Sequence, residues 1–271
     1  MKIHFVTFAT PAFRGRQLLL HYSARRFGDV DESHVWTQAR LSEDGFTARH
    51  PELFPDSTGF GWYAWKPYII LQTLLHAAVG DLVIYQDVGR REPVLISRSL
   101  REWDRFFAEQ NISCIAGVSI PCWGANQFWT KRETFDRMGL HDQHYKDSPQ
   151  VQASWSVWRK CSATESFVRE WANQCQQLDL VGGRLPDGLE GEVAGFKEHR
   201  WDQSILTLLA LRDKMPILTT QEMRHPELNE KCIDSFAKQA NASNWFAFFR
   251  RIVRGYHLLE SKLKSLSSVT K

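Results

Sequence analysis

Hydrophobic residues recur with two different periods along this chain, and the two periods predict its layout. Ile3, Phe5 and Phe8 recur at short spacing over residues 2–8, which predicts a first, central strand. Further strands are predicted over residues 34–37, 81–87, 114–120, 152–159 and 216–220, and helices over 17–26, 67–79, 94–109, 131–138, 164–178 and up to Leu211. Strands that alternate with helices predict an α/β fold with a mixed, mostly parallel sheet flanked by helices.

The stretch from Gly59 to Gly89 is the most informative part of this pattern. Pro67 suits the first position of a helix, and Gly80 suits the end of one. The helix over residues 67–79 and the strand over residues 81–87 would each span roughly 20 Å. Packed antiparallel, they would bring Lys66 and Asp87 to the same edge, where the carboxyl ends of strands bind ligands in open α/β sheets.

Two segments lack either period. Residues 43–58 are polar and contain two prolines, so we expect a mobile loop. Residues 182–195 form a long glycine-rich connection, which inside a compact domain is usually either functional or disordered.

Composition narrows the class of protein. The formal net charge of the 271 residues is +3, and no dense run of Lys and Arg occurs before the C-terminal segment, so nucleic acid is a poor first candidate partner. Five scattered cysteines without a C-x-x-C spacing favour a reducing compartment. We find no signal-peptide pattern and no run of 18 apolar residues, so we expect a cytoplasmic protein.

Asp87 is the strongest candidate for chemistry. It follows an apolar strand, and Gly89 lets the backbone approach a ligand closely. Such a carboxylate can hold Mg²⁺ or Mn²⁺ beside a diphosphate, or it can simply cap a turn. Lys66 can neutralise a phosphate, although a lysine at a helix start is also common. Thr7, at the end of the first strand, can meet a ligand or cap the strand.

A second candidate cluster spans residues 198–204. His199 and Asp202 are three positions apart, which places them on one face if a helix has begun. His199 can bind a metal ion or a phosphate, and Asp202 can act as a general base or stabilise positive charge on a reacting sugar. The alternatives are a structural histidine and an N-cap aspartate.

Eleven tryptophans are an unusually high number for a chain of 271 residues. Sugars stack their C–H faces on aromatic rings, but most tryptophans belong to cores. Trp123 lies in a polar loop and is therefore the tryptophan that we select as a substrate contact.

Several motifs together resemble a known class of enzymes. The motifs are W-x-W-K-P-Y-I-I-L, G-D-L-V-I-Y-Q-D-V-G, W-T-K-R-E-T-F, V-Q-A-S and E-H-R-W-D-Q-S-I-L. They resemble nucleotide-sugar glycosyltransferases of the GT-A fold from bacteria and plants, several of which serve lipopolysaccharide or capsule synthesis. The likeness covers roughly residues 1–220. Many GT-A enzymes carry a D-x-D triplet, whereas this chain has Tyr85-Gln86-Asp87 with one carboxylate.

The resemblance implies sugar transfer from a nucleotide-diphosphate donor, with a UDP-sugar expected, to a saccharide or a lipid-linked glycan. It implies Asp202 and Asp87 as catalytic residues and a divalent cation, Mn²⁺ or Mg²⁺, held by Asp87 and His199. The expected donor contacts are Thr7, Lys66, Gln86, Asp87, Gly89 and His199, and the expected acceptor contacts are Trp123, Asn126 and Gln152. The missing second carboxylate leaves open a nucleotide-sugar or carbohydrate-binding protein without turnover.

The C-terminal segment has a different character. We expect a catalytic domain over residues 1–225 and a helical extension over 226–271. Large apolar residues repeat at spacings of three and four from Trp245 to Leu266, beside six basic residues and one acidic residue up to Lys271. Such a helix can lie on an anionic membrane face, or it can pack on the catalytic domain or on a partner. A third, less favoured hypothesis for the function is a membrane-surface scaffold built on this helix.

Overall fold

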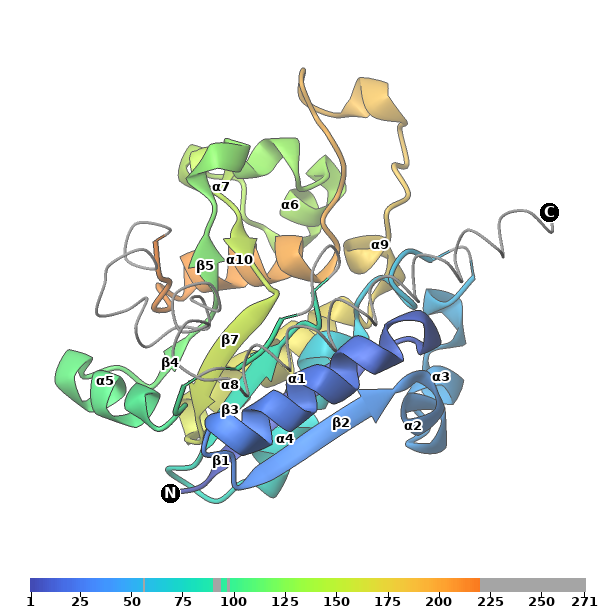
Figure 1. Cartoon of the computed structure of the whole chain (residues 1–271). Coiled ribbons are helices and arrows are strands. Elements are labelled where there is room, and N and C mark those ends of the chain that lie inside the picture. The colour runs from blue at the N-terminus through green and yellow to red at the C-terminus, as the bar shows by residue number, and fades with distance from the viewer. Residues whose placement is uncertain (56, 90–93, 97, 220–271) are drawn as a thin grey trace.

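The computed structural model describes residues 1–55, 57–89, 94–96 and 98–219, and its centre is a five-stranded sheet (Figure 1). The strand order is β2–β1–β3–β7–β4. The strands are β1 (Ile3–Ala9), β2 (Glu32–Thr37), β3 (Leu82–Gln86), β4 (Cys114–Ile115) and β7 (Trp155–Arg159). β1 pairs in parallel with β2 and β3, and β7 runs antiparallel to β3 and β4. Four of the five strands therefore share one direction, which confirms the predicted mixed, mostly parallel sheet.

Helices cover both faces of the sheet (Figure 1). The first hydrophobic core joins the sheet to α4, α8 and α10, and the second core joins its other face to α1 and α5. The helices are α1 (Arg14–Phe27), α2 (Gln38–Glu43), α3 (Phe46–Arg49), α4 (Trp65–His76), α5 (Glu102–Gln110), α6 (Arg132–Met138), α7 (Gln143–Asp147), α8 (Ser162–Cys175), α9 (Leu178–Val181) and α10 (Asp202–Arg212). β1 and β3 are buried along their whole length because both faces carry helices.

A second, two-stranded sheet departs from the prediction. The predicted strands over residues 114–120 and 152–159 are each split, because β5 (Val118–Ser119) and β6 (Val151–Gln152) leave the central sheet and pair with each other. The strand expected over residues 216–220 is reduced to a single bridge between Val118 and Leu218 within the described residues. Thr220 lies outside them.

The prediction of a loop over residues 43–58 is wrong in part. Residues 46–49 form α3, and Pro51–Leu53 form a turn of 3-10 helix. Phe46 and Leu53 are fully buried, and the Phe46 ring lies 4.6 Å from the ring of Tyr68. Their burial in the first core outweighs the polar composition of the segment.

The helix expected over residues 94–109 begins only at Glu102. The Val94 and Ile96 amides donate to the Val88 carbonyl and the Ser23 hydroxyl, at 3.3 and 2.9 Å. These bonds satisfy the backbone without a helix. Leu95, Ile96 and Leu100 are buried, and Ile96 and Leu100 belong to the second core, so their hydrophobic spacing reflects packing against the sheet.

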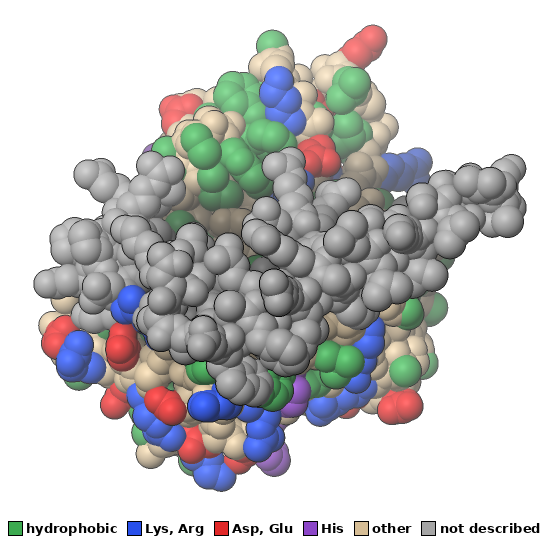
Figure 2. Space-filling view, in the orientation of Figure 1, with side chains coloured by type: hydrophobic (Ala, Val, Ile, Leu, Met, Phe, Trp, Pro, Cys, Tyr) green, Lys and Arg blue, Asp and Glu red, His purple; other side chains and the backbone are tan. Residues whose placement is uncertain are grey.

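The surface agrees with the small net charge. On the face shown in Figure 2, positive and negative side chains are mixed over the lower part of the molecule, and hydrophobic side chains gather in the upper part. No helix among the described residues is long and apolar enough to cross a membrane. The amphipathic helix predicted in the C-terminal segment, and the domain boundary at residue 225, lie outside the described residues.

Candidate active site

Lys66 lies between two carboxylates that are far apart in the sequence. Its ammonium nitrogen is 3.1 Å from Asp202 Oδ2 and 3.8 Å from Asp87 Oδ1. Lys66 belongs to the first turn of α4, Asp87 follows β3, and Asp202 is the first residue of α10. The structure thus brings together the two acidic residues that the sequence selected, at the carboxyl end of β3.

The ammonium of Lys66 is buried, and aromatic rings surround it. The rings of Tyr63 and Tyr85 lie 5.4 and 5.6 Å from it, within the range of a cation–π contact. Burial alone would lower the pKa of Lys66, but the carboxylates of Asp202 and Asp87 outweigh it and raise that pKa. Lys66 therefore stays positively charged at neutral pH.

Asp202 is the buried acid of the site. Only 3% of its side chain is exposed, and burial raises its pKa to about 6 although Lys66 acts in the opposite direction. Oδ2 lies at ion-pair distance from Lys66, yet it accepts no well-formed hydrogen bond from the described residues. Apart from Lys66, Oδ2 has no donor among the described residues, and its surface is covered in this structure.

Asp87 is the solvent-accessible acid of the site. Its side chain is 37% exposed, and its Oδ1 accepts a hydrogen bond from the hydroxyl of Tyr85. Burial raises the pKa of Tyr85 well above its usual value, so Tyr85 remains a donor. Both of these contacts, with Lys66 and with Tyr85, use Oδ1 and not Oδ2. Oδ2 fits one ligand position of Mg²⁺ or Mn²⁺, whose other ligands would be diphosphate oxygens and water.

The backbone beside Lys66 is strained. Residues 59–63 all have positive φ, from +56° at Trp62 to +74° at Gly61, which is costly for the three residues that are not glycine. Trp201 adopts φ +54° and ψ −122° immediately before α10, and its ring packs on those of Tyr63 and Trp62. Strain of this kind concentrates at functional sites because the surrounding fold must hold it in place.

His199 does not face this site. Its Nδ1 accepts the Lys131 amide at 3.4 Å, and its Nε2 donates to the Leu180 carbonyl at 2.9 Å. Burial lowers the pKa of His199 to about 3, so the ring is neutral. Both ring nitrogens are engaged within the protein. The geometry therefore gives His199 a structural place and no free nitrogen for a metal ion.

Three further candidate residues lie in internal contacts. Asn126 is fully buried, and its oxygen accepts from Thr130 and Gln150 while its nitrogen donates to the Tyr145 carbonyl. Gln86 donates to the carbonyls of Asp87 and Ser154, and Thr7 is buried on the face of β1 that packs against α1. All three side chains are buried.

The other candidates border the site. The Gly89 carbonyl accepts from Arg16 at 2.9 Å, which ties the strand end to α1. The chain after Gln152 touches Asp87, because the Asp87 amide donates to the Ser154 carbonyl at 2.8 Å. Trp123 is half-buried, and its ring lies 5.1 Å from the guanidinium of Arg200.

Sequence reasoning missed three contributors, namely Tyr85, Tyr63 and Arg200. The sequence pattern indicates Tyr85 only as part of an apolar strand, although a phenol two residues before Asp87 points to the same face. The guanidinium of Arg200 also lies 5.2 Å from the ring of Trp201, so it joins Trp123 to the segment that carries Asp202. No local signal in the sequence indicates the contacts of Tyr63.

Comparisons with known proteins assign no family. No family model matches the chain, and no curated protein matches its sequence. Among solved structures, mouse xyloside xylosyltransferase 1 matches with a TM-score of 0.42 and 8% identity over 87% of this chain and 95% of that chain. The bifunctional glycosyltransferase WbbM matches with a TM-score of 0.42 and 10% identity, over 80% of this chain and 38% of that chain. Similarity at this level does not by itself establish a function.

Proposed function

We propose that this chain is a glycosyltransferase that moves a sugar from a nucleotide-diphosphate donor, a UDP-sugar, to a saccharide or lipid-linked glycan. The observation that supports this most is the contact of Lys66 with both Asp87 and Asp202 at the carboxyl end of β3. A cation there can neutralise a diphosphate, and a carboxylate beside it can stabilise a positively charged sugar. The sequence motifs quoted above point the same way.

In the reaction, the bond between the anomeric carbon and the diphosphate oxygen breaks, and the oxygen keeps the electron pair. An acceptor hydroxyl oxygen bonds to the anomeric carbon and loses its proton. Lys66 would neutralise charge on the leaving diphosphate, and Asp87 would hold a Mg²⁺ or Mn²⁺ ion that supplies further positive charge there. Asp202 fills one of two roles: it accepts that proton, or it stabilises charge at the anomeric carbon while an oxygen of the leaving diphosphate takes the proton.

The proposal is tested with the purified full chain and a panel of UDP- and GDP-sugars, with saccharide acceptors, in Mn²⁺ or in EDTA. We expect one donor to raise the melting temperature and to release free nucleotide. Binding without nucleotide release would instead indicate a nucleotide-sugar-binding protein without turnover. If no donor binds under either condition, the proposal is wrong.

Asp202→Asn is expected to lower kcat more than it weakens donor binding, because the lost charge acts on the reacting carbon. In the wild type, kcat/KM should fall as pH drops through about 6, since protonation of Asp202 removes its negative charge. Donor affinity is measured by calorimetry and rates by nucleotide release. An unchanged rate in Asp202→Asn would exclude a catalytic role for the Asp202 carboxylate.

A further inference from the structure

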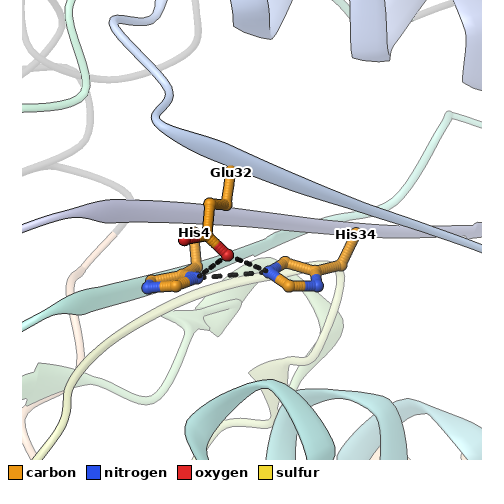
Figure 3. A group of neighbouring side chains, drawn as sticks. All are labelled: His4, Glu32 and His34. Atoms are coloured by element: carbon orange, nitrogen blue, oxygen red, sulfur yellow. Dashed lines mark hydrogen bonds and ion pairs between the residues drawn. The ribbon is translucent and has the colours of Figure 1, made fainter. Parts of the chain in front are cut away.

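Three neighbouring side chains of types that can bind a metal ion lie at the opposite end of the sheet from Asp87. His4 is on β1, and Glu32 and His34 are on β2 (Figure 3). The parallel register pairs His4 with Glu32 and Val6 with His34, which places the three side chains next to one another. His4 pairs with Val83 on β3, four residues before Asp87, so the two regions are about 13 Å apart along the strand.

The three facing atoms have the spacing of a metal site. His4 Nδ1 lies 3.2 Å from His34 Nε2 and 3.5 Å from Glu32 Oε2, and the last two atoms are 3.9 Å apart. Tetrahedral Zn²⁺ with bonds of about 2.0–2.1 Å has ligand atoms about 3.3 Å apart. The three atoms therefore outline one face of a tetrahedron, with only small movements needed.

His4 also contacts a carboxylate through its second ring nitrogen, as metal-binding histidines commonly do. The other ring nitrogen, Nε2, lies 3.2 Å from Asp81 Oδ2. Asp81 is itself held by the amides of Lys2 and Ala78, at 2.7 and 3.0 Å. A carboxylate on the far nitrogen of a histidine directs the near nitrogen toward a metal ion. Asp81 thus leaves His4 Nδ1 to face Glu32 and His34.

Neighbouring contacts also orient Glu32 and His34 toward His4 Nδ1. Lys2 donates to Oε1 of Glu32 at 2.7 Å, which leaves Oε2 toward the histidines. His34 Nε2 faces the same space, 3.2 Å from His4 Nδ1 and 3.9 Å from Glu32 Oε2.

A fourth ligand is within reach. His76, the last residue of α4, has its Nε2 3.9 Å from Glu32 Oε2, and its ring centre lies 6.2 Å from that of His34. The His76 side chain is 71% exposed, so it can rotate toward the other three groups at little cost.

We propose that a Zn²⁺ ion binds to His4 Nδ1, Glu32 Oε2 and His34 Nε2, with His76 Nε2 completing the tetrahedron. The ion takes the place of the proton shared between His4 and His34, and it links β1, β2 and the end of α4. Two imidazoles and a carboxylate are a common donor set for Zn²⁺. The site is a structural one, and it does not depend on the proposed function.

The test uses the full chain, reduced and stripped of metal by a chelator that is then removed. Zn²⁺ is titrated in competition with a chromophoric chelator, and Co²⁺ is added separately to report tetrahedral geometry by its visible absorption. We expect one Zn²⁺ per chain and a higher melting temperature in its presence. His34→Ala and Glu32→Gln should each weaken binding by about 100-fold or more, and Asp81→Asn by about 10- to 100-fold.

His141→Ala is the matched control. His141 Nδ1 lies 3.4 Å from a carboxylate oxygen of Asp136, but no third ligand joins them among the described residues, so its removal should leave Zn²⁺ binding unchanged. Glu32→Gln keeps the shape of a partly exposed side chain, and its folding is checked by circular dichroism. Zn²⁺ affinity that is equal in the wild type, His34→Ala and Glu32→Gln, or the absence of any bound Zn²⁺, would overturn the proposal.

Discussion

Lys66→Met is expected to lower the free energy of unfolding by about 3–5 kcal/mol, because it leaves the buried carboxylate of Asp202 without its cation. The side chains of Lys66 and Asp202 are 5% and 3% exposed, so solvent compensates only weakly for the lost charge. Methionine has a similar length and fills most of the same volume, which limits the loss of packing. The measurement is urea unfolding of the wild type and the variant at pH 7.5.

The loss should shrink as the pH falls. Without Lys66, the pKa of Asp202 rises above the value of about 6 that it has in the wild type, because the attraction that lowered it is gone. The folded variant then binds a proton that the unfolded chain releases near neutral pH. Its stability relative to the wild type therefore falls as pH rises and recovers as pH drops toward 5.

Two further variants decide the cause. Lys66→Met/Asp202→Asn removes both charges, so it should recover most of the stability that Lys66→Met loses. Lys2→Met removes an exposed ion pair with Glu32 and should change stability little in metal-free buffer. If the double variant is as unstable as Lys66→Met, then packing of the lysine side chain, and not its charge, holds this part of the fold.

Asp87→Asn is expected to reduce the rate of sugar transfer by about 10²–10³-fold with little change in stability. The substitution keeps the size of the side chain but removes the charge that would hold a metal ion on the diphosphate. The Asp87 side chain is 37% exposed, and asparagine keeps an oxygen that can accept from Tyr85, so the fold depends little on the charge. The rate is measured as nucleotide release with saturating donor.

Glu109→Gln is the control for Asp87→Asn, since Glu109 is an exposed carboxylate on α5 that pairs with Arg105. It should leave transfer unchanged. Tyr85→Phe removes the hydrogen bond to Asp87 Oδ1 and should cause a smaller loss of rate than Asp87→Asn. Full activity of Asp87→Asn, with Mn²⁺ present, would remove Asp87 from the mechanism.

The local sequence was sufficient to predict the helix–strand unit that carries Lys66 and Asp87. The predicted helix over residues 67–79 and strand over residues 81–87 correspond to α4 and β3. Both elements are mostly apolar, Pro67 and Gly80 mark the ends of the predicted helix, and the similar lengths of helix and strand return the chain to the same edge. The 3.8 Å contact of Lys66 with Asp87 follows from those lengths.

The orientation of His199 shows where local reasoning stops. The spacing of three residues places His199 and Asp202 on one face only if both belong to a helix. α10 begins at Asp202, and the positive φ of Trp201 turns the chain between them. His199 consequently points into contacts with Lys131 and Leu180, while Asp202 points to Lys66. A left-handed tryptophan has no signal in the sequence, because packing against Tyr63 and Trp62 imposes it.

The sequence by itself determined the α/β class and the pairing of a helix-start lysine with a strand-end acid, because periodicity and element length are local properties. Only the tertiary structure decided that Asp202 joins this pair, that Leu95, Ile96 and Leu100 are buried outside a helix, and that His4, Glu32 and His34 meet. Those outcomes depend on strand register and on packing between distant segments. The free energy that decides them comes from contacts between distant segments, and the spacing of residues in the sequence does not reveal those contacts.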